Sequence, residues 1–147
     1  MRRVAGEALV GASRDEVWQL LDDLEGTPRW LPGVRSVSAS GPTRVGTRYR
    51  TETMVLGMAR SRAWEVVEHR PQHRQVRVAS DGSVERRLVL TLDGRGSGTR
   101  LHAELQFRSA LPFPVSLAHE VAAAAWSAGS AQTLVAAVKR AFEGRPR

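Results

Sequence analysis

The sequence predicts an α+β domain in which a curved antiparallel sheet is covered on one face by a single long helix near the C-terminus. Three observations predict this fold class. Between residues 34 and 107, short runs of alternating apolar residues are separated by turn residues, as in antiparallel strands. From Pro114 to Phe142, apolar or small residues recur every three or four positions, as one face of a helix requires. The length of 147 residues, with 41% hydrophobic and 25% charged residues, suits one globular domain.

The N-terminal part is predicted to form one strand followed by two short helices. Residues 3–12 alternate weakly and indicate the first strand. The sequence S-R-D-E that starts at Ser13 is a capping box, and leucines at helical spacing follow it until Gly26, a natural stop. A second short helix is expected to begin at Pro28, because proline is favoured at the first helical position, and to carry Trp30.

From Val34 onward the apolar pattern has a period of two, which predicts six further strands. Turn residues such as Asp81-Gly82 separate them, and such short connections make neighbouring strands antiparallel. Leu88, Leu90 and Leu92 share one face, which sets the inward side of their strand. The expected strands after the first are residues 34–40, 48–55, 59–68, 74–79, 84–92 and 99–107.

The predicted C-terminal helix carries unusually small side chains along the middle of its apolar face. They include the alanines of residues 122–125 and the run from Ala128 to Ala131. Small side chains either let the helix approach the sheet closely or leave a hollow beneath it, and the sequence leaves both open. We expect a single domain over residues 1–143 and a frayed tail over residues 144–147.

Composition and charge pattern argue against several classes of function. The net charge is +7, but the arginines are scattered rather than clustered, so nucleic-acid binding is not expected. No run of 18 apolar residues is present, which predicts no membrane span, and Glu7 argues against a signal peptide, which favours a cytoplasmic protein. There is no cysteine. No metal or cofactor is expected, and the oligomeric state is expected to be a monomer or a homodimer.

A series of short motifs in a fixed order carries a resemblance to a known family. The motifs are Ser13-x-x-Glu16-Val17-Trp18, Trp30-Leu31-Pro32-Gly33-Val34, Val45-Gly46-Thr47-x-Tyr49, Trp64-Glu65-Val66-Val67-Glu68 and Gly98-Thr99-Arg100-Leu101. Together they resemble the START-like (SRPBCC) superfamily, and most of all its polyketide cyclase/dehydrase branch. The resemblance implies a helix-grip fold with a cavity between the sheet and the helix. It also implies apolar ligands such as lipids or polyketides, with aromatase/cyclase activity in some members.

Strand parity selects the candidate ligand-binding residues. If Trp64 faces inward, so do Arg62 and, further along, Glu68, while Arg86 shares the face of Leu88. Inward arginines would bind a carboxylate, phenolate or carbonyl group; the alternative is that they lie near strand ends and reach solvent. The full candidate set is Trp30, Tyr49, Arg62, Trp64, Arg86, Leu88, Phe107, His119 and Trp126.

Three functions remain open from the sequence. The favoured one is binding of a small hydrophobic or aromatic molecule; the second is a polyketide aromatase/cyclase-like enzyme that uses Arg62, Tyr49 and His119. The third is a structural or macromolecule-binding module in which the alanines seat the helix tightly and the cavity is negligible. His69 and His73 are separated by a proline and lack a third ligand nearby, so they do not indicate a metal site, and Asp22-Asp23 is expected to face solvent.

Overall fold

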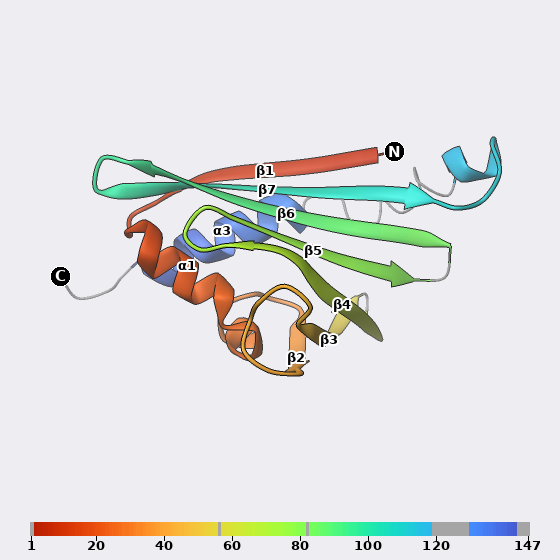
Figure 1. The fold of residues 1–147 in the computed structure, drawn as a ribbon, viewed down its shortest axis with the longest axis horizontal. Helices are drawn as coiled ribbons and strands as arrows, with labels where there is room; N and C mark the ends of the chain where they lie inside the picture. Colours follow the sequence, from red (N-terminus) through yellow and green to blue (C-terminus); the bar gives the residue numbers. More distant parts are fainter. Residues whose placement is uncertain (1, 56, 82, 119–129, 144–147) are drawn as a thin grey trace.

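The computed structural model describes residues 2–55, 57–81, 83–118 and 130–143, and it confirms the predicted fold class. Seven antiparallel strands form one sheet in the order β1-β7-β6-β5-β4-β3-β2, and helix α3 lies across one of its faces (Figure 1). The strands are β1 (Arg2–Val10), β2 (Val34–Ala39), β3 (Arg48–Val55), β4 (Met58–Arg70), β5 (Arg74–Asp81), β6 (Val84–Arg95) and β7 (Gly98–Ser109). The helices are α1 (Arg14–Asp22), the 3₁₀ helix η1 (Leu24–Arg29) and α3 (Ser130–Phe142).

The sheet is built from consecutive hairpins, and β1 joins it at the far edge by pairing with β7. Strands β6 and β7 pair without interruption up to Arg95 and Gly98, so the connecting turn is shorter than the glycine-rich stretch suggests. The predicted strands are all present, and most differ from the observed ones by one to three residues at an end. In the described part of the chain, no helix is long and apolar enough to cross a membrane.

A bulge in β4 changes which residues face the helix side of the sheet. The register between β4 and β5 shifts between Val66 and Glu68. Because the extra residue reverses the alternation, Glu68 turns to the outer face and His69 turns inward, opposite Gln75. The expectation that Glu68 faces inward with Trp64 is therefore wrong, since strict parity holds only up to the bulge.

The two short helices after β1 are present, but their boundary differs from the expected one. The capping box at Ser13 forms as predicted, with the N–H of Glu16 donating to the Ser13 hydroxyl at 3.2 Å. Helix α1 ends at Asp22, and the side chain of Asp23 accepts the N–H of Gly26 and starts η1. Gly26 is thus buried within the second helix rather than ending the first one, because the aspartate cap nucleates a new turn before it.

Helix α3 lies directly on β1 and β7, the two strands at one edge of the sheet (Figure 1). A Cβ atom added at Gly6 would lie 2.6 Å from the Cα of Gln132, so the backbones of β1 and α3 are in contact there. Ala103 of β7 and Ala131 of α3 are also buried at this junction. Small side chains thus bring the helix close to this part of the sheet. The helical pattern expected from Pro114 to Phe142 includes residues 119–129, which lie outside the described residues.

Candidate functional site

A cavity of about 420 Å³ lies between α3 and the inner face of the sheet, on the side away from β1. Its walls come from the inner face of strands β2 to β7, from η1 and the segment that follows it, and from Thr133 and Leu134 of α3. This volume is within the usual range for small-molecule sites, about 300 to 1,000 Å³. The lining residues are Leu21, Thr27, Trp30, Leu31, Pro32, Gly33, Val34, Val37, Tyr49, Thr51, Thr53, Met54, Arg62, Trp64, Arg77, Arg86, Leu88, Leu105, Thr133 and Leu134.

Most of the cavity wall is apolar and partly aromatic. The rings of Tyr49 and Trp64 come from neighbouring strands, lie 6.2 Å apart between centroids and are nearly parallel, with an interplanar angle of 7°. They share the inner face because directly opposite residues of an antiparallel pair point to the same side. Leu88 and Leu105 continue this surface on β6 and β7. Such a wall provides a flat apolar surface that suits an aromatic or hydrophobic molecule.

Three arginines add a basic component to this apolar wall. Arg62, Arg77 and Arg86 come from β4, β5 and β6 and all line the cavity. The guanidinium of Arg86 lies over the ring of Phe107, with its central carbon 5.9 Å from the ring centroid. None of the described residues that line the cavity is an aspartate or a glutamate. The polar groups of the wall therefore favour a ligand that presents oxygen acceptors.

Tyr49 is the only tyrosine of the chain and lies deep in this wall, with 6% of its surface exposed. Burial raises the pKa of its hydroxyl above the ordinary value, because desolvation disfavours the phenolate. The charge of Arg77 and its hydrogen bond to Tyr49 oppose this effect by stabilising the phenolate. The hydroxyl is thus protonated at neutral pH and able to donate a hydrogen bond to a ligand oxygen.

Arg77 belongs to a chain of polar groups that the sequence did not reveal. Its Nη2 donates to the main-chain oxygen of Leu21 at 2.7 Å, and its Nε donates to Oε1 of Gln75 at 2.8 Å. The amide of Gln75 in turn donates to the Asp22 carboxylate at 3.0 Å. His69 Nε2 lies 2.8 Å from the same carboxylate oxygen. This chain links the cavity to helix α1 through the core.

Sequence reasoning missed Arg77 because the valines of β5 obscured the parity of the strand. Val76 and Val78 alternate with Gln75 and Arg77, which suggests that the valines face inward. The register shows the reverse, since Arg77 lies opposite Leu88 and Val76 lies opposite Val89 on the outer face. The leucines of β6 mark the inward face of that strand. They would have identified Arg77 as an inward residue if the register between β5 and β6 had been known.

Trp30 ends helix η1 and lies on the border of the cavity. Its indole Nε1 is buried and has no hydrogen-bond partner among the described residues. The same side chain also lines an outer groove beside Arg140 and Ala141 of α3. Trp30 therefore separates the cavity from the surface, and its N–H is a donor that a ligand oxygen would satisfy.

The structure places six of the nine predicted site residues in the wall of this one cavity: Trp30, Tyr49, Arg62, Trp64, Arg86 and Leu88. Phe107 is fully buried and packs with Val84 behind Arg86, so it supports the wall without being part of it. His119 and Trp126 lie outside the described residues. That the nine predicted residues bind a ligand stays a prediction.

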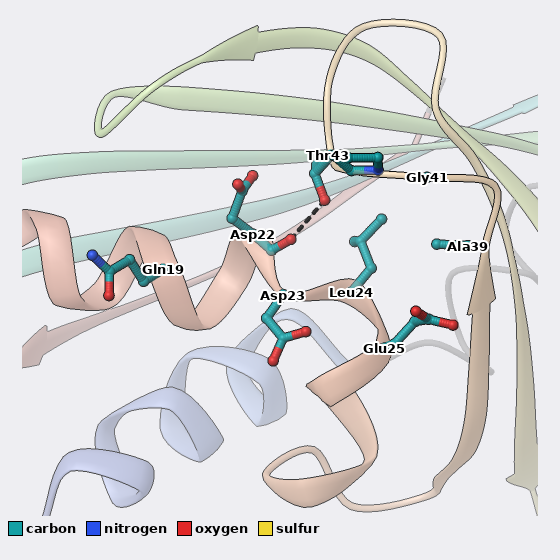
Figure 2. Close-up of a pocket in the computed structure, with 9 residues that line it drawn as sticks. Gln19, Asp22, Asp23, Leu24, Glu25, Ala39, Gly41 and Thr43 are labelled. Atoms are coloured by element: carbon teal, nitrogen blue, oxygen red, sulfur yellow. Dashed lines mark hydrogen bonds between the residues drawn. The ribbon is translucent and has the colours of Figure 1, made fainter.

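A second hollow of about 430 Å³ lies on the outside of the molecule, between α1, η1 and the β2–β3 connection (Figure 2). Figure 2 shows the Thr43 hydroxyl meeting the main-chain oxygen of Asp22, a bond of 2.6 Å. The carboxylates of Asp22 and Asp23 point in opposite directions from the chain. Contrary to expectation Asp22 is only partly exposed, because it accepts bonds from β4 and β5. This hollow has a small apolar surface and is the weaker candidate for an apolar ligand.

A curved antiparallel sheet that surrounds a C-terminal helix, with a cavity between them, defines the START-like helix-grip class of protein. The chain belongs to the polyketide cyclase/dehydrase and lipid transport family, because the model of that family matches residues 1–143. None of the curated proteins matches the sequence.

Solved structures of the same class share the fold over almost the whole chain. The ZhuI aromatase/cyclase from Streptomyces sp. R1128 matches with a TM-score of 0.82 and 16% identity, over 99% of this chain and 96% of that one. A START superfamily protein from Mycobacterium smegmatis has a TM-score of 0.77 and 15% identity, with coverages of 96% and 97%. The di-domain aromatase/cyclase BexL from the BE-7585A biosynthetic pathway has a TM-score of 0.76 and 21% identity over 95% of this chain and 46% of that chain. At these identities the likeness is one of fold.

Proposed function

We propose that the protein binds a small hydrophobic or aromatic molecule in the cavity between the sheet and α3. The observation that carries this proposal is the cavity itself, whose apolar and aromatic wall includes a few polar groups that can orient a ligand. Membership of a family described by polyketide cyclisation and lipid transport supports it. A location in the cytoplasm and a monomeric or homodimeric state stay predictions.

A neutral apolar probe tests this proposal without involving the arginines. N-phenyl-1-naphthylamine should bind saturably, with a rise in its fluorescence, and stoichiometric titration should give one site per chain. Thr51 lines the cavity on β3, so Thr51→Trp would fill part of the volume. We expect this change to weaken probe binding by about tenfold or more, because a ligand and an indole compete for the same space.

A matched variant controls for the added tryptophan. Ser38 is exposed on β2, directly after the cavity-lining Val37, and it pairs with Arg50 of β3. Its side chain therefore points to the outer face of the sheet, opposite to that of Val37. Ser38→Trp should leave probe affinity unchanged. If the native protein shows no saturable binding of the probe, or if both variants bind as the native protein does, the cavity is not a binding site.

A second candidate function is an aromatase/cyclase-like reaction, which Tyr49 and Arg62 favour because both line the same cavity. They would polarise carbonyl groups of a poly-β-ketone during aldol closure and dehydration. Arg62→Ala and Tyr49→Phe should then abolish turnover of such a substrate while the melting temperature stays within a few degrees of the native value. Full activity in both variants would remove these roles and leave binding as the function.

A further inference from the structure

Arg77 places a buried positive charge at the wall of the cavity. Arg77 is 7% exposed, lines the cavity and projects from the middle of β5. Its contacts are the main-chain oxygen of Leu21, the side-chain amide oxygen of Gln75 and the side chain of Tyr49, whose ring centroid lies 5.7 Å from the guanidinium carbon. All three partners are neutral at pH 7.

Arg77 has no counter-ion within ion-pair distance among the described residues. The nearest carboxylate on its hydrogen-bond chain is that of Asp22, and the amide of Gln75 stands between the two. A buried guanidinium that lacks an opposite charge is strongly disfavoured, since it has lost most of its hydration. The folded protein thus keeps a positive charge at the cavity wall that no described side chain neutralises.

The same contacts hold the guanidinium in a fixed position. Bonds from two different nitrogens to Leu21 and Gln75 fix its plane, and the ring of Tyr49 covers one side. A guanidinium held in this way has lost its side-chain entropy before the ligand arrives, and it retains further N–H groups. Its donor geometry matches the two oxygens of a carboxylate.

We infer that the ligand is an aromatic or apolar molecule that carries a carboxylate, and that the carboxylate binds at Arg77. This inference rests on the proposed function and specifies its ligand. The apolar body would lie against Trp64 and Leu88, which line the cavity on the strands to either side of β5. The ligand supplies the negative charge that the protein lacks at this position.

A pair of ligands that differ only in charge tests the inference on the native protein. 2-Naphthylacetate and 2-naphthylacetamide have the same apolar body, and only the first is an anion at pH 7. We expect the acid to bind about tenfold more tightly or better, as measured by tryptophan fluorescence and calorimetry, because a hydrogen bond to a charged group is stronger than a neutral one. Equal affinity for the two would overturn the inference, yet the proposed function would stand. If neither compound nor the neutral probe binds, both proposals fail.

A substitution then assigns the preference to one residue. Arg77→Gln should reduce the preference for the acid to about threefold or less, while affinity for the amide changes little. The control is Arg87→Gln, which removes the same charge from an exposed position on the outer face of β6 and should keep the native preference. A preference for the acid that survives in Arg77→Gln would place the carboxylate elsewhere and overturn the assignment.

Arg77→Lys keeps the test decisive if Arg77→Gln does not fold, which circular dichroism would show. Lysine preserves the charge and loses the planar fork that bonds Leu21 and Gln75. We expect acid affinity to fall several-fold and amide affinity to stay the same. An equal loss for both compounds would mean that Arg77 acts only on the structure of the cavity, which contradicts the inference.

Discussion

The two halves of the sheet meet the C-terminal helix in opposite ways. The closed half consists of β1, the residues of β7 up to Ala103 and the residues of β6 beyond Leu88. Backbone meets backbone there at Gly6, and Leu90, Leu101 and Ala103 are completely buried. In the open half, which consists of β2 to β5 with Arg86 and Leu88 of β6 and Leu105 of β7, large and polar side chains surround a cavity. The same helix thus packs tightly against the closed half and covers the cavity of the open half.

The difference teaches that small residues under a helix do not by themselves predict a cavity. Gly6 and Ala131 allow close approach, and this approach fixes the height of the helix above the closed half. The sheet curves, so a helix fixed at one edge stands away from the other edge. The cavity is therefore a consequence of tight packing elsewhere. Ala131, the one residue of the run from Ala128 to Ala131 whose burial is described, lies at the tight contact and not under the cavity.

The largest expected effect comes from two leucines on the same face of β6. Leu90 is fully buried in the closed half, and Leu88 lines the cavity two residues away. Leu90→Ala should lower the free energy of unfolding by about 3 to 5 kcal/mol, because it creates a new void. Leu88→Ala should cost roughly 2 kcal/mol, because it only enlarges an existing one. Urea denaturation of both variants measures the difference, and equal losses would contradict the division into halves.

A glycine substitution tests the contact that positions the helix. Gly6→Ala should lower the free energy of unfolding by about 1 to 3 kcal/mol, because the new methyl group would overlap the backbone of α3. Gly11 follows β1 directly and has no atom within 4 Å of an added Cβ, so Gly11→Ala is the control and should change stability by less than about 0.5 kcal/mol. A neutral Gly6→Ala variant would show that the closed half is not tightly packed.

The smallest effect concerns Tyr49 in the open half and appears only at high pH. Its pKa in the folded protein is raised by burial, so the folded state holds the proton more tightly than the unfolded state does. The free energy of unfolding should therefore be unaffected below the unfolded pKa of about 10 and fall as the pH rises above it. Tyr49→Phe should lack this decline, and a similar decline in both proteins would assign it to another group.

The titration can be followed directly, because the chain has a single tyrosine. Absorbance of the phenolate near the red edge of the protein band should give a midpoint above the ordinary value for tyrosine. Arg77→Gln should raise the midpoint further, since the charge and hydrogen bond of Arg77 lower the pKa of Tyr49. The surface variant Arg87→Gln should leave the midpoint in place, and a midpoint that Arg77→Gln lowers would contradict the described contact.

The sequence by itself determined the fold class, the strands and much of the site. Alternation along β3, β4 and β6 was enough to predict that Tyr49, Arg62 and Arg86 face inward, because period-two patterning is a local property of an extended chain. The capping box at Ser13 is likewise read from neighbouring residues alone, and it forms as expected.

Only the tertiary structure decided the remaining features, because each depends on how distant segments align. Because of the bulge after Val66, His69 faces inward in place of Glu68, and no local pattern marks where a register will shift. Arg77 became a cavity residue through its pairing with Leu88. The hollow itself exists because Gly6 and α3, more than a hundred residues apart in the sequence, meet closely enough to hold the helix away from the opposite strands.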